Sequence, residues 1–184
     1  MATLELNDWQ LVRRTNDGAV IEQEPAAASA AKGSLIFGRE ALACSRSHPQ
    51  QFNARYLHSL SADPIAGDLG RAKNHADLVY QHLLQLELPA GEDVCLAIPG
   101  YLTNDQLGLL LGICQEAGLT VNGFVETALA HSLHLPSDGA SHVLDIEMYR
   151  LCLTEITDDG DTRSVVRTSS IDGLGVANLV EGWM

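Results

Sequence analysis

The pattern of apolar and polar positions is clearest in the middle of the chain. Residues 94–98 form an uninterrupted apolar run, which is typical of a strand covered on both faces. Thr103 precedes a helical pattern over residues 104–117, and the glutamine three positions later can complete a capping box. Gly118 occupies the usual position after a helix, and a second helix is predicted over residues 126–134. The centre therefore predicts a buried strand followed by two helices.

Shorter apolar runs flank this centre. Asn7 and Asp8 separate the first two runs and tolerate the positive φ of a tight turn, which predicts a hairpin. Strands are predicted over residues 4–6, 9–12, 20–21, 34–37, 142–146, 151–156 and 164–168. Helices are predicted over residues 39–46, 50–60 and 69–86 and shortly after residue 175. The alanine-rich residues 25–33 predict a surface loop, and no internal repeat stands out.

The balance of charge narrows the classes of partner. The chain has 24 acidic and 11 basic residues, which give a formal net charge of -13. A field of this sign repels phosphate backbones and anionic lipid, so we expect neither nucleic acid nor membrane partners. No apolar run approaches the ~20 residues of a membrane-spanning helix, and the N-terminus lacks the pattern of a signal peptide. We therefore expect a cytoplasmic protein.

Cysteines and histidines are the first candidates for metal ligands. No Cys-x-x-Cys spacing occurs, so reduced thiols packed as small hydrophobes are expected at Cys44, Cys95, Cys114 and Cys152. His75 and His82 share one predicted helix, and His131 and His134 share another, without a cysteine or acid at ligand spacing. Surface or capping histidines are therefore favoured over a metal site. The acidic residues 158–161 lack the remaining ligands of a calcium loop and predict a hairpin turn.

The central elements also carry a recognisable order of motifs. Residues 98–106 read Ile-Pro-Gly-Tyr-Leu-Thr-Asn-Asp-Gln, residues 117–119 read Ala-Gly-Leu, and Glu126 then heads an alanine-rich helix. This order over residues 94–135 resembles the superfamily of actin and the heat-shock chaperone ATPases, in which Pro-Ala-Tyr follows the strand. Weaker similarity to the same superfamily covers residues 37–41, 143–146 and 172–175.

The resemblance implies an α/β fold of the ribonuclease H-like (actin-like ATPase) class, with a mixed sheet flanked by helices. Residues 1–138 would form the first lobe, and residues 139–184 would form the first strands and helix of a second lobe that continues in a longer protein. In this family a β-hairpin from each lobe holds the nucleotide phosphates through backbone N–H groups beside glycines. An acid at each hairpin helps to hold the metal ion.

Both hairpins of this chain depart from the family pattern. Glu5 stands where the first acid is expected, and Asp145 matches the second acid, but the glycines of both phosphate loops are missing. Side chains at residues 147–149 occupy the second loop and block close approach of the backbone. Glu126 lies near the cleft of the family, although a glutamate that favours the helix dipole is the alternative. By family position alone, the candidate cofactor-binding residues are Glu5, Asp145 and Glu126, and no catalytic or metal-binding residue is assigned.

The loss of both glycine sets predicts a pseudo-ATPase that acts as a protein-interaction or scaffold module and holds no cofactor. Actin-like domains without full phosphate loops occur among bacterial assembly and secretion components, which gives this interpretation a precedent. The alternative is a chaperone-type ATPase that binds ATP with magnesium through atypical loops. A protein partner or self-association is expected, because the last helix carries an apolar face with little to cover it. That face comprises Leu174, Leu179, Val180 and Trp183.

Overall fold

The computed structural model describes residues 2–31, 33–86, 88, 91, 93–134 and 139–182. Contacts divide the chain into two compact units: Met1–Leu96 with Thr103–Gly123, and Ala97–Leu102 with Phe124–Met184. The architecture is α/β with a mixed sheet flanked by helices, so this part of the predicted fold class is confirmed. Residues 135–138 lie outside the described part of the chain, and the lobe boundary at residue 138 stays a prediction.

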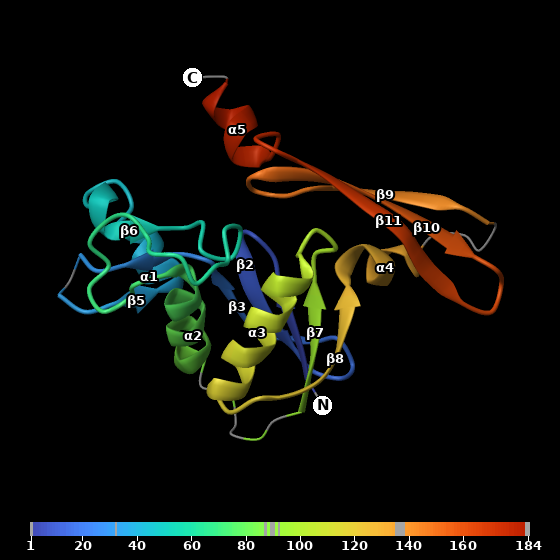
Figure 1. The fold of residues 1–184 in the computed structure, drawn as a ribbon, viewed down its shortest axis with the longest axis horizontal. Coiled ribbons are helices and arrows are strands. Elements are labelled where there is room, and N and C mark those ends of the chain that lie inside the picture. The colour runs from blue at the N-terminus through green and yellow to red at the C-terminus, as the bar shows by residue number, and fades with distance from the viewer. Residues whose placement is uncertain are drawn as a thin grey trace. The chain divides into compact units, whose positions relative to one another are not determined.

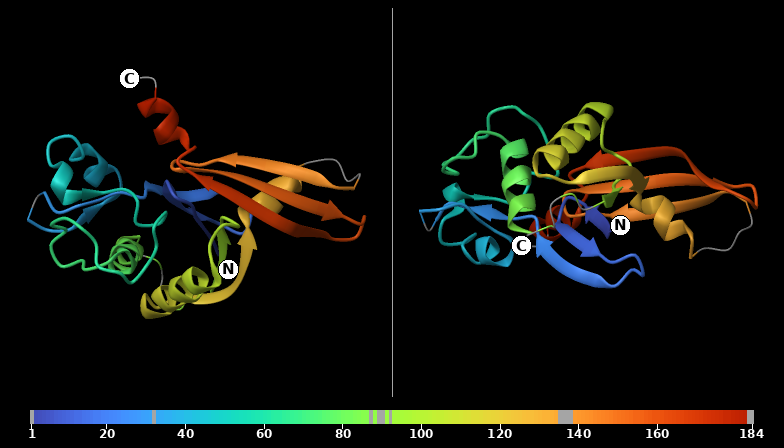
Figure 2. Two further views of the ribbon diagram at one scale, coloured as in Figure 1. Left: turned by 45° about the horizontal axis from the view of Figure 1, so that its top comes forward. Right: turned by 90° about the horizontal axis from the view of Figure 1, so that it is seen from below.

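The larger sheet has five strands in the order β3-β2-β1-β7-β8. The first three form an antiparallel meander, and β7 and β8 point the same way in Figure 1. Helices α2 and α3 lie on one face of this sheet (Figures 1 and 2). The strands are β1 (Ala2–Leu6), β2 (Gln10–Arg14), β3 (Val20–Pro25), β7 (Asp93–Ile98) and β8 (Thr120–Glu126), and the helices are α2 (His75–Gln85) and α3 (Asn104–Glu116).

The predicted central elements are confirmed, together with the local chemistry that bounds them. Thr103 Oγ1 accepts from the backbone N–H of Gln106 at 3.2 Å, and Thr103 N donates to Gln106 Oε1 at 3.0 Å, which forms the capping box. Gln106 Nε2 also donates to the carbonyl of Leu60 at 3.1 Å. Gly118 follows the helix with a φ of 81°, a conformation that side chains rarely adopt.

Two predictions in the first unit are wrong because distant segments pair there. Residues 25–33 contain a buried strand, β4 (Ala28–Ser29), instead of a surface loop. It pairs with β5 (Ile36–Phe37) and with β6 (Phe52–Asn53), and in place of the helix predicted over residues 50–60 the structure has the short β6 followed by turns. A 3-10 turn precedes β6, and the short helix α1 (Gly38–Ala43) follows β5. Backbone groups of β4 find partners in this sheet that no local pattern reveals.

The helix predicted over residues 69–86 begins only at His75. Asn74 has extended backbone geometry, and its Oδ1 accepts from the N–H of Asp77 at 2.7 Å, which caps the helix at this point. Gly70, with a φ of 65°, ends any helical run before the cap. The apolar spacing of residues 69–74 therefore coincides with a loop.

The second unit contains a three-stranded antiparallel sheet in the order β11-β10-β9. Helix α4 packs against all three strands, and the face that carries Cys152, Thr154 and Ile156 is buried. Helix α5 follows at the end of the meander (Figure 2). The elements are β9 (Ser141–Ile146), β10 (Arg150–Asp158), β11 (Arg163–Asp172), α4 (Thr127–Ser132) and α5 (Val176–Glu181).

The meanders β1–β3 and β9–β11 have the same construction, although the sequence shows no repeat. Each has a three-residue hairpin tip, a register shift between its second and third strands, and a final residue bonded back to the tip. Across the tip, the first tip residue donates from its backbone N–H to the carbonyl that follows the tip: Asn7 to Gln10 at 3.2 Å and Glu147 to Arg150 at 2.9 Å. The residue after the third strand donates back to the last tip residue: Ala26 to Trp9 at 2.6 Å and Gly173 to Tyr149 at 2.9 Å. In this correspondence Glu5 matches Asp145, because each lies two residues before its tip.

Candidate functional site

The first hairpin tip uses its backbone donors within the chain. Asn7 Oδ1 accepts from the N–H groups of Trp9 at 3.0 Å and of Gln10 at 2.9 Å. The carboxylate of Asp8 is fully buried, with Oδ2 3.8 Å from Nδ1 of His58. A side-chain oxygen therefore takes the place that an anion would need beside these N–H groups.

Glu5, the first candidate cofactor-binding residue, already has a cationic partner. Its Oε2 accepts from Nη2 of Arg14 at 3.2 Å and from Nε at 3.4 Å, on neighbouring strands of one sheet. The glutamate side chain is 19 % exposed, so this ion pair is only partly screened by water. Arg14 offsets the charge with which Glu5 would attract a hydrated metal ion.

The second hairpin tip is covered by the segment that begins α5. Val176 N donates to the carbonyl of Glu147 at 2.8 Å, and Ala177 N donates to that of Met148 at 2.9 Å. A Cβ at Gly175 would collide with the peptide between Met148 and Tyr149, so glycine is needed for this approach. Two carbonyls of the tip thus bind the donor-rich first turn of α5, which covers the tip, and the N–H of Glu147 donates to the carbonyl of Arg150 at 2.9 Å.

Asp145 and Glu126 lie in the second unit with separate partners. Asp145 Oδ1 is 3.7 Å from Nδ1 of His131, whose side chain is 60 % exposed. Glu126 Oε2 accepts from Oγ1 of Thr168 at 3.4 Å, and Thr168 Oγ1 is 3.1 Å from Oγ1 of Thr154. Glu126 directly precedes α4 and makes no side-chain capping bond there. Each of these two acids is thus held by side chains of its own unit.

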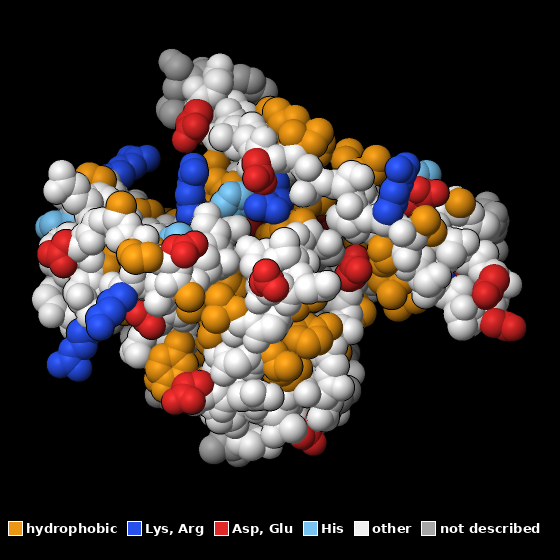
Figure 3. All heavy atoms as spheres, viewed as in Figure 1, with side chains coloured by type: hydrophobic (Ala, Val, Ile, Leu, Met, Phe, Trp, Pro, Cys, Tyr) orange, Lys and Arg blue, Asp and Glu red, His pale blue; other side chains and the backbone are white. Residues whose placement is uncertain are grey.

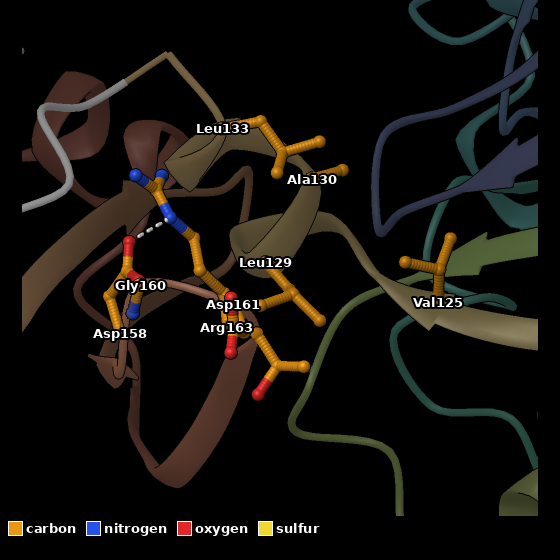
Figure 4. A pocket seen from close by; sticks show the side chains of 9 residues that line it. Val125, Leu129, Ala130, Leu133, Asp158, Gly160, Asp161 and Arg163 are labelled. Carbon is orange, nitrogen blue, oxygen red and sulfur yellow. Dashed lines mark hydrogen bonds and ion pairs between the residues drawn. The ribbon is translucent and has the colours of Figure 1, made fainter.

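A pocket of about 370 Å³ lies in the second unit between α4 and the β10–β11 turn (Figure 4). Asp158 Oδ2 accepts from Nε of Arg163 at 2.6 Å, and Arg163 Nη1 also donates to the carbonyl of Ser132. Asp158 and Arg163 therefore satisfy each other, Asp161 and Thr162 add polar groups from the turn, and the α4 side of the pocket is apolar. The sequence signal for this pocket is weak, since apolar spacing on α4 equally describes a packed helix. The apolar lining residues are Val125, Leu129, Ala130 and Leu133.

The acidic turn at residues 158–161 forms a hairpin connection, as predicted. Backbone N–H groups of Thr162 and Asp161 donate to Asp159 Oδ1 at 2.8 and 3.1 Å, and these bonds hold the pKa of Asp159 below its usual value. Among the described residues, no group of three or more His, Cys, Asp or Glu side chains is arranged to hold a metal ion. All four cysteines are described and form no disulfide.

The prediction that His82 is a surface or capping histidine is wrong. It is 1 % exposed, stacks on Phe37 with ring centroids 4.9 Å apart, and lies with Nδ1 2.6 Å from the hydroxyl of Tyr56. Burial lowers the pKa of His82 to about 4 and raises the pKa of Tyr56, so both groups are neutral at pH 7. The pair is a satisfied core contact, and the available signal was that His82 falls at helical spacing from the buried Val79 and Leu86.

The chain matches no protein-family model and no curated protein. In the described part of the chain, every helix is too short or too polar to span a bilayer.

Proposed function

We propose that this chain is an actin-like domain, related to the heat-shock chaperone ATPases, that serves as a protein-interaction module without a competent phosphate site. Two observations support the ribonuclease H-like assignment. The strand–helix–strand–helix order of β7, α3, β8 and α4 agrees with the motif order on which the resemblance rests. The two equivalent meanders agree with the pair of phosphate hairpins that the family carries.

The functional proposal rests on the hydrogen bonds within the chain that satisfy backbone groups of both hairpin tips. Asn7 takes two backbone donors at the first tip, and the start of α5 takes two carbonyls at the second. Opening either tip would cost the bonds that now satisfy it, at about 1 kcal/mol for each neutral bond. The net charge of -13 adds repulsion toward a triphosphate. A cytoplasmic protein or a second copy of the chain is the partner class that this charge and the apolar surface favour.

Isothermal titration calorimetry with ATP and magnesium tests this proposal. We expect no binding heat from the native chain at nucleotide concentrations of about 1 mM, the range of a weak complex. The Asn7→Gly variant serves as the comparison, because it releases the donors of Trp9 and Gln10 while the second tip stays closed. A dissociation constant near 10 μM or below for the native chain, roughly -7 kcal/mol, would favour the chaperone-type ATPase instead.

A further inference from the structure

Positive charge is concentrated in one segment of this acidic chain. Residues 25–74 contain six basic and three acidic residues, a net charge of +3, although the whole chain carries -13. The remaining residues therefore carry -16. The segment lies in the first unit and includes β4, β5, β6 and α1, and Figure 3 shows Lys and Arg side chains on this side of the unit. Such a local reversal of charge favours an anionic ligand or partner.

A cavity of about 840 Å³ beside this segment is formed by residues of the first unit. Its volume falls in the range of about 300–1,000 Å³ that ligand sites occupy. Arg71 and Lys73 line it, both residues are exposed, and within the described part of the chain neither side chain forms an ion pair or a hydrogen bond. Other cations of the chain are already paired with an acid: Arg14, Arg150, Arg163 and Arg167. The cavity thus offers two cations to a ligand.

Two carboxylates of the cavity wall restrict the ligand further. Asp68 Oδ1 accepts from the N–H of Gly70 at 3.3 Å, and Asp77 Oδ2 accepts from the N–H of Lys73 at 2.8 Å. These bonds hold the loop that carries both cations, and they use one oxygen of each carboxylate. A phosphate group presents acceptor oxygens and a negative charge, which these acids repel. A peptide also presents backbone N–H donors, which the second oxygen of each carboxylate can accept.

The remaining polar wall of the cavity suits a peptide backbone. Gln51 and Gln81 each offer an amide that donates and accepts, and Ser34 and Tyr80 each offer a hydroxyl. Peptide groups present a donor and an acceptor in turn along the chain. A wall that mixes both kinds of group can satisfy them.

We propose that this cavity binds a short acidic peptide segment of a partner protein. Side-chain carboxylates of the peptide pair with Arg71 and Lys73, and its backbone N–H groups donate to Asp68 and Asp77. This inference rests on the proposed role as an interaction module and names its site and the chemistry of its partner. Nucleic acid is disfavoured, because an extended row of phosphates meets the -16 of the remaining chain, which a segment confined to the cavity avoids.

Fluorescence anisotropy tests the proposal with a dye-labelled, capped peptide of alternating aspartate and glycine at low ionic strength. We expect a dissociation constant of about 10–100 μM, and weaker binding as added salt screens the contact. The same peptide with asparagine in place of aspartate should not bind, because it lacks the charge that pairs with Arg71 and Lys73.

Three matched substitutions separate the cavity from the general field of the segment. Arg71→Gln and Lys73→Gln should each weaken peptide binding at least about fivefold, since each removes a charge-assisted contact. Arg46→Gln is the control, because Arg46 is an exposed cation of the same segment that does not line the cavity. All three variants change the net charge equally, so a difference between them measures the cavity alone. Circular dichroism verifies that each variant is folded.

A native chain that leaves the aspartate peptide unbound at about 1 mM overturns the proposal. Equal weakening by all three substitutions also overturns it, because the segment would then attract anions without a site. Oligothymidylate of equal formal charge is the competing probe, and tighter binding of this DNA than of the peptide would show that the ligand class is wrong. Calorimetry with ATP judges the proposed function separately: peptide binding without ATP binding supports both inferences, whereas the absence of both overturns this one alone.

Discussion

His82 makes the stability of the chain depend on pH in a calculable way. The folded protein holds the imidazole neutral, since burial lowers its pKa from 6.5 to about 4. The unfolded chain takes up the proton near pH 6.5. Between these values the unfolded state binds more protons than the native state, so the free energy of unfolding falls as the pH decreases through this window.

The size of the effect follows from the two pKa values. At pH 5, protonation of His82 stabilises the unfolded state relative to the native state by about 2 kcal/mol. Below pH 4 this stabilisation levels off near 3 kcal/mol. Against a total stability of about 5–15 kcal/mol, this is a measurable share. The hydroxyl of Tyr56, 2.6 Å from Nδ1, adds no charge that would oppose the shift.

Urea denaturation of the native chain and of the His82→Gln variant, followed by circular dichroism between pH 7.5 and pH 5, measures this contribution. Glutamine can still accept from Tyr56 but does not titrate, so the variant should lose about 2 kcal/mol less over this range. His48→Gln is the control, because His48 is exposed and its variant should follow the native curve. Parallel curves for the native and His82→Gln proteins would refute the assignment of a buried neutral imidazole.

Two glycine substitutions test the backbone at the second tip and in α3. Gly175→Ala should destabilise the second unit by about 1–3 kcal/mol, because its Cβ collides with the Met148 peptide, whereas Gly123→Ala meets open space. Equal thermal melting of both variants would contradict the close approach of α5. Gly108→Ala, at an exposed position inside α3 with open space around it, should stabilise the helix by about 0.5–1 kcal/mol in urea denaturation. A loss of stability there would show that the glycine has a packing role.

The elements that the sequence alone determined are those bounded by local chemistry. The capping box at Thr103 and the left-handed glycine at position 118 act within one turn of the helix that they bound. The hairpin at Asn7 and the turn before Thr162 likewise depend on side chains that bond to backbone groups two or three residues away. Such signals survive without tertiary context, so these predictions agree with the structure.

Only the tertiary structure decided the elements whose partners are distant in sequence. Ala28 pairs with Asn53, so short strands lie within the predicted loop at residues 25–33 and the predicted helix at residues 50–60. His82 became a core residue because Phe37 and Tyr56 reach it from other segments. At the candidate site, the sequence showed which side chains replace the glycines. That the start of α5 satisfies two carbonyls of the second tip follows from folding, since these hydrogen-bond partners lie almost thirty residues apart in the sequence and meet only in space.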